Sequence, residues 1–181
     1  MERAGEAAER PVRVFISYAR ADIVLVRALA EALHAYGYFA DYDLGGDEAR
    51  IDGGLSPSDD WWKRLQDNIA AADVVIFVVS PEASTSSVCD DEIKWAQDLG
   101  KRIIPIVARR IDFQALPKRL SSLNLSLPFS EAAGTAHLPF ESFDVSFRRL
   151  VAAIEIDLDW LREGARITAL ALTWVRNGRP A

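Results

Sequence analysis

Two long apolar runs limit the folds open to this chain. The first, VVIFVV, covers residues 74–79, and the second, RIIPIV, covers residues 102–107. A strand with one face in water alternates apolar and polar residues, whereas a parallel strand covered on both faces is apolar almost throughout. From PVRVFISY onward, short β-branched or aromatic runs alternate with segments of helical periodicity. This alternation predicts a parallel sheet with crossover helices, and the two apolar runs lie at its centre.

The remaining elements complete the prediction of a three-layer α/β/α fold. Strands are expected at 12–17, 38–42, 74–79, 102–107 and 123–129. Helices are expected at 21–36, 60–72, 87–99 and 140–156. Gly37 ends the first helix, because glycine is the usual residue just after a helix C-terminus. Open sheets of this size usually place the first strand beside the third and the second outside, so we expect five parallel strands in the order 2-1-3-4-5.

The two ends of the chain are interpreted as additions to this domain. We expect a mobile arm at residues 1–10, the domain at residues 11–156, and a C-terminal helical extension at residues 157–181. One face of the extension carries Trp160, Ile167, Leu170, Ala171 and Trp174. We expect this face to pack on the domain or to await a partner, and we expect a further domain beyond residue 181.

Composition excludes several classes of function. A formal charge of −6 argues against a nucleic-acid partner, because such binding depends on Lys and Arg neutralising phosphates. Cys89 is the only cysteine, so no internal disulfide can form, and no metal-ligand set is present. There is neither a signal-peptide stretch nor a run of about 20 apolar residues, so we expect a cytoplasmic protein without a membrane partner. The basic pairs Arg109–Arg110 and Arg148–Arg149 are interpreted as solvated faces or helix ends.

Glu92 breaks the pattern of the helix predicted at 87–99. At about 100° per residue, it falls in the apolar arc between Val88 and Cys89 on one side and Ala96 on the other. Ser87 with Asp90 predicts a capping box, which leaves Glu92 beyond the last free backbone N–H. A lone buried carboxylate costs several kcal/mol, so Glu92 is expected to line a cleft or to have a partner. The nearest obvious cation is Arg20.

The expected topology brings three loops to the edge where Glu92 lies. The loop after the first strand carries Tyr18 and Arg20, and the loop after the third begins at Ser80. After the second strand, Asp41 is followed by an unusually long segment, 43–60, that leads to the adjacent residues Trp61 and Trp62. One of these two tryptophans is expected in the core and the other at the rim.

Motifs of the common enzyme classes are absent. The chain has no H-E-x-x-H, G-x-S-x-G, G-x-x-x-x-G-K-[ST] or strand-linked G-x-G-x-x-G. The only histidines, His34 and His137, are interpreted as structural. Two interpretations of Glu92 remain from the residues alone: a functional carboxylate at a cleft, or a carboxylate that merely pairs with Arg20 or caps a loop.

Six ordered segments resemble a bacterial Toll/interleukin-1 receptor (TIR) domain over residues 12–156. They are VFISYARAD, YFADYD, DWW, VVIFVVSPEA, SSVCDDEI and GKRIIPIV. The resemblance implies a flavodoxin-like fold and self-association with other TIR domains. Many members cleave NAD+ to nicotinamide and an ADP-ribose product with a glutamate in the helix after the third strand. By motif, that catalytic glutamate is Glu92.

The resemblance also implies a substrate site. Its expected substrate-binding residues are Tyr18, Arg20, Asp41, Trp61, Ser80 and Cys89. NAD+ is the implied substrate, and no cofactor or metal is expected. Val88 stands where many active members have tryptophan. In this family the loop corresponding to 43–60 covers the site and mediates assembly.

Three hypotheses for function follow from the residues and the resemblance. The first is an NAD+ glycohydrolase, active on assembly, in bacterial signalling or antiphage defence. The second is a non-enzymatic adaptor that signals by TIR-to-TIR contact, which the long loop and the tail helix suggest. The third is a domain that binds a nucleotide or an ADP-ribose-like signal without turnover.

Overall fold

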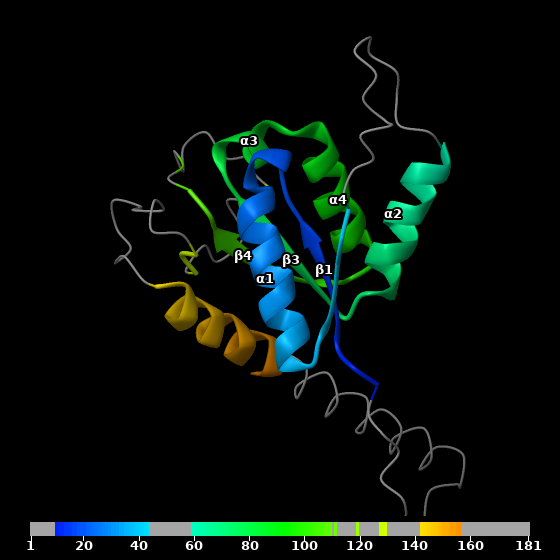
Figure 1. Ribbon diagram of the computed structural model, residues 1–181. Helices are drawn as coiled ribbons and strands as arrows, with labels where there is room; N and C mark the ends of the chain where they lie inside the picture. Colours follow the sequence, from blue (N-terminus) through cyan, green and yellow to red (C-terminus); the bar gives the residue numbers. More distant parts are fainter. Residues whose placement is uncertain are drawn as a thin grey trace, which may run out of the picture.

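The computed structural model describes residues 10–43, 59–109, 111, 119, 127–129 and 142–156. Within them, four parallel strands form one sheet in the order β2-β1-β3-β4. The strands are β1 (Arg13–Ser17), β2 (Phe39–Tyr42), β3 (Val74–Val79) and β4 (Arg102–Val107). The sequence-based order is therefore confirmed for these four strands, and the two apolar runs are the neighbours β3 and β4 (Figure 1).

Helices cover both faces of the sheet. They are α1 (Ile23–Tyr36), α2 (Asp59–Ala71), α3 (Pro81–Thr85), α4 (Ser87–Asp98) and a helix over 143–156, with a short 3-10 turn, η1 (Arg20–Asp22), before α1. The helix 143–156 and α1 lie on one face, and α2 and α4 lie on the other (Figure 1). This arrangement confirms the three-layer α/β/α architecture. No helix among the described residues is long and apolar enough to cross a membrane.

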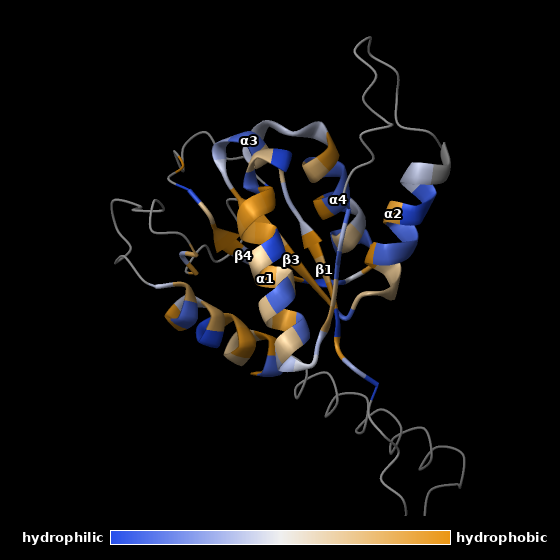
Figure 2. Ribbon diagram, viewed as in Figure 1, coloured by the Kyte–Doolittle hydropathy of each residue, from blue (hydrophilic) through white to orange (hydrophobic). Residues whose placement is uncertain are grey.

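Two apolar clusters hold the layers together, one on each face of the sheet. The cluster under α1 and the helix 143–156 contains Val14, Ile16, Leu29, Leu33, Leu150 and Ile154. The cluster under α2 and α4 contains Phe15, Val75, Phe77, Leu65, Ile69 and Ile93. Successive side chains of a strand point to opposite faces, so β1 supplies both clusters in turn. Figure 2 shows the apolar strands and the amphipathic helices around them.

The fifth predicted strand is only partly described. Residues 123–126 lie outside the described residues, and 127–129 contain one isolated parallel bridge, between Pro128 and Val107. The backbone N–H of Val107 donates to Leu127 O at 2.7 Å, and that of Phe129 donates to Val107 O at 2.9 Å. Residues 127–129 therefore lie beside β4, in the position that the order 2-1-3-4-5 requires.

Several helix boundaries differ from the sequence-based prediction. Residues 20–22 form η1, so α1 begins at Ile23 rather than at residue 21. Gly37 ends this helix at φ 100°, in the left-handed region, as predicted. The capping box at Ser87 was wrong, because the cap is Ser86, whose hydroxyl accepts from the Cys89 N–H at 3.3 Å. Ser86 is free for this role because the unpredicted helix α3 ends one residue earlier.

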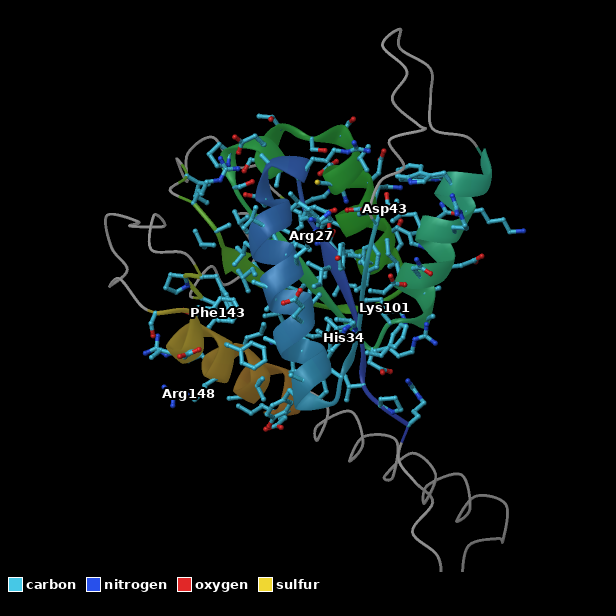
Figure 3. All side chains as sticks on the ribbon, in the orientation of Figure 1. Arg27, His34, Asp43, Lys101, Phe143 and Arg148 are labelled. Atoms are coloured by element: carbon cyan, nitrogen blue, oxygen red, sulfur yellow. The ribbon has the colours of Figure 1, made fainter. Side chains whose placement is uncertain are left out.

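The amino-terminal edge of the sheet is anchored by two side chains. Asp73 accepts from the backbone N–H of Arg13 at 2.9 Å and binds the guanidinium of Arg10. Lys101, labelled in Figure 3, donates to the carbonyls of Ala70 at 2.6 Å and Ala72 at 2.7 Å, at the end of α2. Of the arm predicted at 1–10, only Arg10 is described; the rest, and the extension 157–181, lie outside the described residues.

Candidate active site

Glu92 is buried on the inner face of α4, at the carboxyl edge of the sheet. Only 5% of the residue is exposed, whereas its neighbour Asp91 lies on the solvent side of the same helix. Cys89 at 2% and Ala96 at 0% exposure lie on the same inner face. The sequence-based expectation of an inward-facing carboxylate in an apolar arc is therefore confirmed.

The hydrogen-bond partner of Glu92 is Ser17, the last residue of β1. The Ser17 hydroxyl donates to Oε2 of Glu92 in a short, buried hydrogen bond. Ser17 is two residues beyond Phe15, so it points to the same face of the sheet, where α4 packs. Arg20, the partner expected from sequence, is exposed, and Ser17 was missed because a lone serine at a strand end has no distinctive pattern.

Burial controls the protonation of Glu92. Loss of hydration raises the pKa of Glu92 to about 8, the Ser17 hydrogen bond opposes this rise, and the negative charge of Asp43 adds to it. The neutral form therefore predominates at neutral pH in the protein without ligand. A positive charge placed beside this carboxyl would favour its ionised form.

Asp43 connects the end of β2 to the start of α2. Its Oδ2 accepts from Nε1 of Trp61 at 2.9 Å, and its backbone carbonyl accepts from the hydroxyl of Tyr18 at 2.8 Å. Figure 3 labels Asp43 in the region between α4 and α2. The first bond links the two sides of the segment 44–58, which itself lies outside the described residues, and the second links Asp43 to the turn after β1. Sequence reasoning selected Asp41 and missed Asp43, although alternation in Asp41-Tyr42-Asp43 puts both acids on one face.

Trp61 and Tyr18, two further predicted site residues, both bind Asp43. Trp61 is 8% exposed and belongs to the cluster under α2, and Trp62 is half-buried with its ring centroid 5.7 Å away. This confirms the expected division between a core and a rim tryptophan. Tyr18 is half-buried against Tyr42, at 6.0 Å between centroids. Burial raises the pKa of Tyr18 to about 12, Asp43 adds to the rise, and the nearby positive charge of Arg20 opposes it.

Asp41 and Cys89 occupy different surroundings at the same edge. Asp41 is half-buried in β2 and pairs in register with Phe15. No hydrogen bond found within the described residues joins its side chain to Glu92. Cys89 is a buried free thiol one turn before Glu92, and burial raises its pKa to about 12. The thiol therefore remains protonated and behaves as a small apolar side chain.

Ser80 belongs to a buried polar network rather than to the surface of the site. It is 0% exposed, donates to Oδ2 of Asp22 at 2.6 Å and accepts from the N–H of Ala83 at 3.2 Å. Arg109 donates to Oδ1 of Asp22 through Nε at 3.1 Å and Nη2 at 2.9 Å, and it also pairs with Glu82. Because Ser80 has no exposed surface, it could reach a substrate only if its surroundings moved.

This network corrects the interpretation of Arg109 and explains where η1 lies. Arg109 was expected on a solvated face or at a helix end; its side chain is 34% exposed, but it also neutralises Asp22, whose side chain is only 2% exposed. The network ties η1 after β1 to the ends of β3 and β4, and so it holds the turn that follows Ser17 and Tyr18. Arg148 and Arg149 do lie exposed on the helix 143–156, as expected. His34 is structural, as expected, because Nε2 contacts Ala40 O at 2.9 Å.

The described residues contain no group of three or more His, Cys, Asp or Glu side chains placed to hold a metal ion. The arrangement therefore offers one buried carboxyl, a hydroxyl that orients it, a second carboxylate and an indole. Such a site suits stabilisation of positive charge on a ligand, because these groups lie where hydration is reduced.

The raised pKa of Glu92 predicts an unusual pH dependence of folding stability. The unfolded chain titrates this carboxyl near the ordinary value of 4.5 and the folded chain near 8. Its stabilising contribution is therefore full below about pH 4.5 and is lost as the pH rises to about 8, by at most about 1.4 kcal/mol per pH unit. Glu92→Gln should remove this loss, which urea unfolding from pH 4.5 to 9 measures. Asp91→Asn is the control, and parallel curves for wild type and Glu92→Gln would contradict the assignment.

Removal of Arg109 should destabilise the fold through Asp22. Arg109→Ala leaves a buried carboxylate with Ser80 as its remaining partner, so we expect a loss of about 3 kcal/mol in the free energy of unfolding. Adding Asp22→Asn to Arg109→Ala should recover part of this loss, because the amide carries no charge. Arg148→Ala, on an exposed face, serves as the control. Equal stabilities of Arg109→Ala and Arg148→Ala would show that the network has no such role.

Comparison with known proteins agrees with this fold. The sequence profile of the TIR domain family matches residues 14–138. The TIR domain of the Toll-related receptor TRR-2 from Hydra magnipapillata is similar at 21% identity and a TM-score of 0.52, over 78% of this chain and 97% of that one. This likeness shows the fold.

Two further solved structures are similar at lower TM-scores. The TIR domains of the activated Roq1 resistosome, which recognises the pathogen effector XopQ, match at 15% identity and 0.42, over 83% of this chain and 76% of that one. The CMP N-glycosidase BcmB of Clostridium botulinum matches at 25% identity and a TM-score of 0.39, over 53% of this chain and 69% of that one. No curated protein matches the chain. The profile match spans more than half of the chain and includes both Ser17 and Glu92, so the chain belongs to the TIR domain family.

Proposed function

We propose that this TIR domain is an NAD+ glycohydrolase that cleaves the bond between nicotinamide and ribose. The observation that carries the proposal is Glu92, a carboxyl buried at the carboxyl edge of the sheet and oriented by Ser17. Its helix follows the third strand, which is where the family resemblance places the catalytic glutamate. Ligands of open parallel sheets bind at this edge.

The chemistry of NAD+ requires little more than such a carboxyl. The C1′–N bond breaks with its electron pair going to the nicotinamide ring, which loses its positive charge and leaves neutral. Protonation of the leaving group is therefore unnecessary, unlike in ordinary glycoside hydrolysis. Water then attacks C1′ and loses a proton, giving ADP-ribose, nicotinamide and H+.

Glu92 would act on the positive charge that develops on the ribose. The approach of the cationic substrate favours the ionised form of this carboxyl, whose pKa is raised to about 8 in the protein without ligand. The carboxylate then stabilises the oxocarbenium-like transition state, and burial strengthens this effect because water is excluded. Ser17 would hold the carboxylate in place, and Cys89 and Ala96 would keep the surroundings dry.

Four other predicted residues would lie around the nucleotide. Trp61 would offer an aromatic wall, and Arg20, exposed near Tyr18, would suit the phosphates. Asp41 and Tyr18 would flank the site. No metal or bound cofactor takes part in this scheme.

The proposal includes activation by assembly with other copies, in bacterial signalling or antiphage defence in the cytoplasm. The family resemblance supports assembly as the trigger. Two rival functions make different predictions: an adaptor would assemble without consuming NAD+, and a nucleotide-binding domain would be stabilised by NAD+ without releasing nicotinamide.

Release of nicotinamide tests the proposal directly. The full chain, clustered on a scaffold or at high concentration, should release nicotinamide from NAD+, and Glu92→Gln should lower the rate at least about 100-fold, because the charge that stabilises the transition state is lost. Chromatographic quantification of nicotinamide measures this rate.

Asp91→Asn is the matched control, since Asp91 lies on the same helix but faces solvent. It should retain the wild-type rate. Absence of nicotinamide release in every clustered state, or an active Glu92→Gln variant, would contradict the proposed activity.

A further inference from the structure

Asp43 is held in one position by contacts on both its backbone and its side chain. Trp61 donates to its carboxylate at 2.9 Å, and Tyr18 donates to its carbonyl at 2.8 Å. The indole donor comes from α2 and the phenol from the turn after β1. Two such bonds leave the carboxylate little freedom, so its charge is preorganised.

The register of the sheet, extended by one residue, brings Asp43 opposite Ser17, the hydrogen-bond partner of Glu92. β1 and β2 pair with Phe15 opposite Asp41 and Ile16 opposite Tyr42. Continuing by one residue sets Asp43 opposite Ser17, at the spacing of about 5 Å that separates neighbouring strands. Ser17 binds Glu92, so strand alternation puts Asp43, just after β2, on the face of the sheet that α4 covers. The rise that Asp43 causes in the pKa of Glu92 agrees with this proximity.

Within the described residues, hydrogen bonding occupies only one oxygen of the Asp43 carboxylate. Oδ2 accepts the indole N–H, and within the described part of the chain no hydrogen bond is found to Oδ1. The face of an indole attracts cations, and a carboxylate attracts them more strongly. A rigid carboxylate bonded to an indole therefore favours a ligand that carries a positive charge over a neutral ligand of the same shape.

We infer that Asp43 is a specificity-determining residue: its fixed charge selects nucleotides whose departing base is a cation, such as a pyridinium, over nucleotides with a neutral base. The inference rests on the proposed function and assigns to Asp43 a role separate from that of Glu92. Glu92 stabilises the charge that develops on the sugar, whereas Asp43 recognises the charge already present on the base. Neither role requires Asp43 to give or take a proton.

The test compares NAD+ with NADH, whose dihydronicotinamide ring has no positive charge. Binding is measured by isothermal titration calorimetry in the Glu92→Gln background, so that NAD+ is not consumed and Glu92 does not titrate. This variant should bind NAD+ more tightly than NADH, and adding Asp43→Asn should reduce the ratio of the two affinities about tenfold, because one charge near the ring is lost.

Two variants separate the charge of Asp43 from its hydrogen bond. Asn can still accept from the Trp61 N–H, so Asp43→Asn keeps the bond and loses the charge. Trp61→Phe loses the bond and keeps the charge; it should weaken the binding of both nucleotides and lower the ratio of their affinities less than Asp43→Asn does. An unchanged ratio in Asp43→Asn, or an equal fall of the ratio in Trp61→Phe, would show that Asp43 only fastens the loop ends and would overturn the inference.

A further measurement needs no change at Asp43. Raising the salt concentration from about 20 to about 500 mM should lower the preference for NAD+ over NADH, because salt screens the charge of Asp43. A preference independent of salt would contradict the inference even if Asp43→Asn failed to fold. If the wild type releases nicotinamide but Asp43→Asn leaves the affinity ratio unchanged, the inference about Asp43 is wrong and the glycohydrolase proposal stands. If Asp43→Asn lowers the ratio but no nicotinamide is released, the glycohydrolase proposal is wrong and the inference about Asp43 stands.

Discussion

The site depends on one interaction, the buried hydrogen bond between the Ser17 hydroxyl and the Glu92 carboxyl. It joins β1 to α4, two elements far apart in the chain. Burial makes the carboxyl costly to ionise, and the hydroxyl offsets only part of that cost. The result is a group that is neutral in the free protein and becomes charged when a cation compensates it. This property suits a substrate that arrives positively charged and reacts through a sugar cation.

The rest of the fold keeps this pair in position. Strand alternation sends Ser17 and Asp43 to the face covered by α2 and α4, while Val14 and Ile16 fill the opposite cluster. Asp22 holds the turn after β1 in place, because both Arg109 and Ser80 bind its carboxylate. Asp43 then fastens the start of α2 to the same edge through Trp61. Asp22 thus ties the turn after β1 to the ends of β3 and β4, and Asp43 ties the end of β2 to α2.

Periodic features could be predicted from sequence, and non-periodic partners could not. The apolar runs identified β3 and β4, Gly37 identified a helix end, and the position of Glu92 in an apolar arc identified its burial. Each is a local pattern with a fixed period or a fixed backbone requirement. The partner of Glu92 is different: Ser17 is 75 residues away, and Arg20 was preferred only because it carries the opposite charge.

Two other misses have related physical causes. Arg109 was expected on a solvated face or at a helix end because no nearby residue in the sequence pairs with it, yet the fold positions it beside a buried acid contributed by η1. The cap of α4 was displaced by one residue because two serines are adjacent and only the backbone conformation distinguishes them. Asp43 could have been found from the period of two in Asp41-Tyr42-Asp43, together with its position at the strand end.

The most direct test of the central claim is the titration of the Glu92 carboxyl itself. Carbon-detected NMR of protein labelled at glutamate side chains, with Glu92→Gln to assign the resonance, follows this group with and without NAD+ at a temperature where turnover is slow. The account predicts a midpoint near pH 8 in the free protein and a clearly lower midpoint when NAD+ is bound. A midpoint near 4.5 in the free protein, or one that NAD+ leaves unchanged, would contradict it.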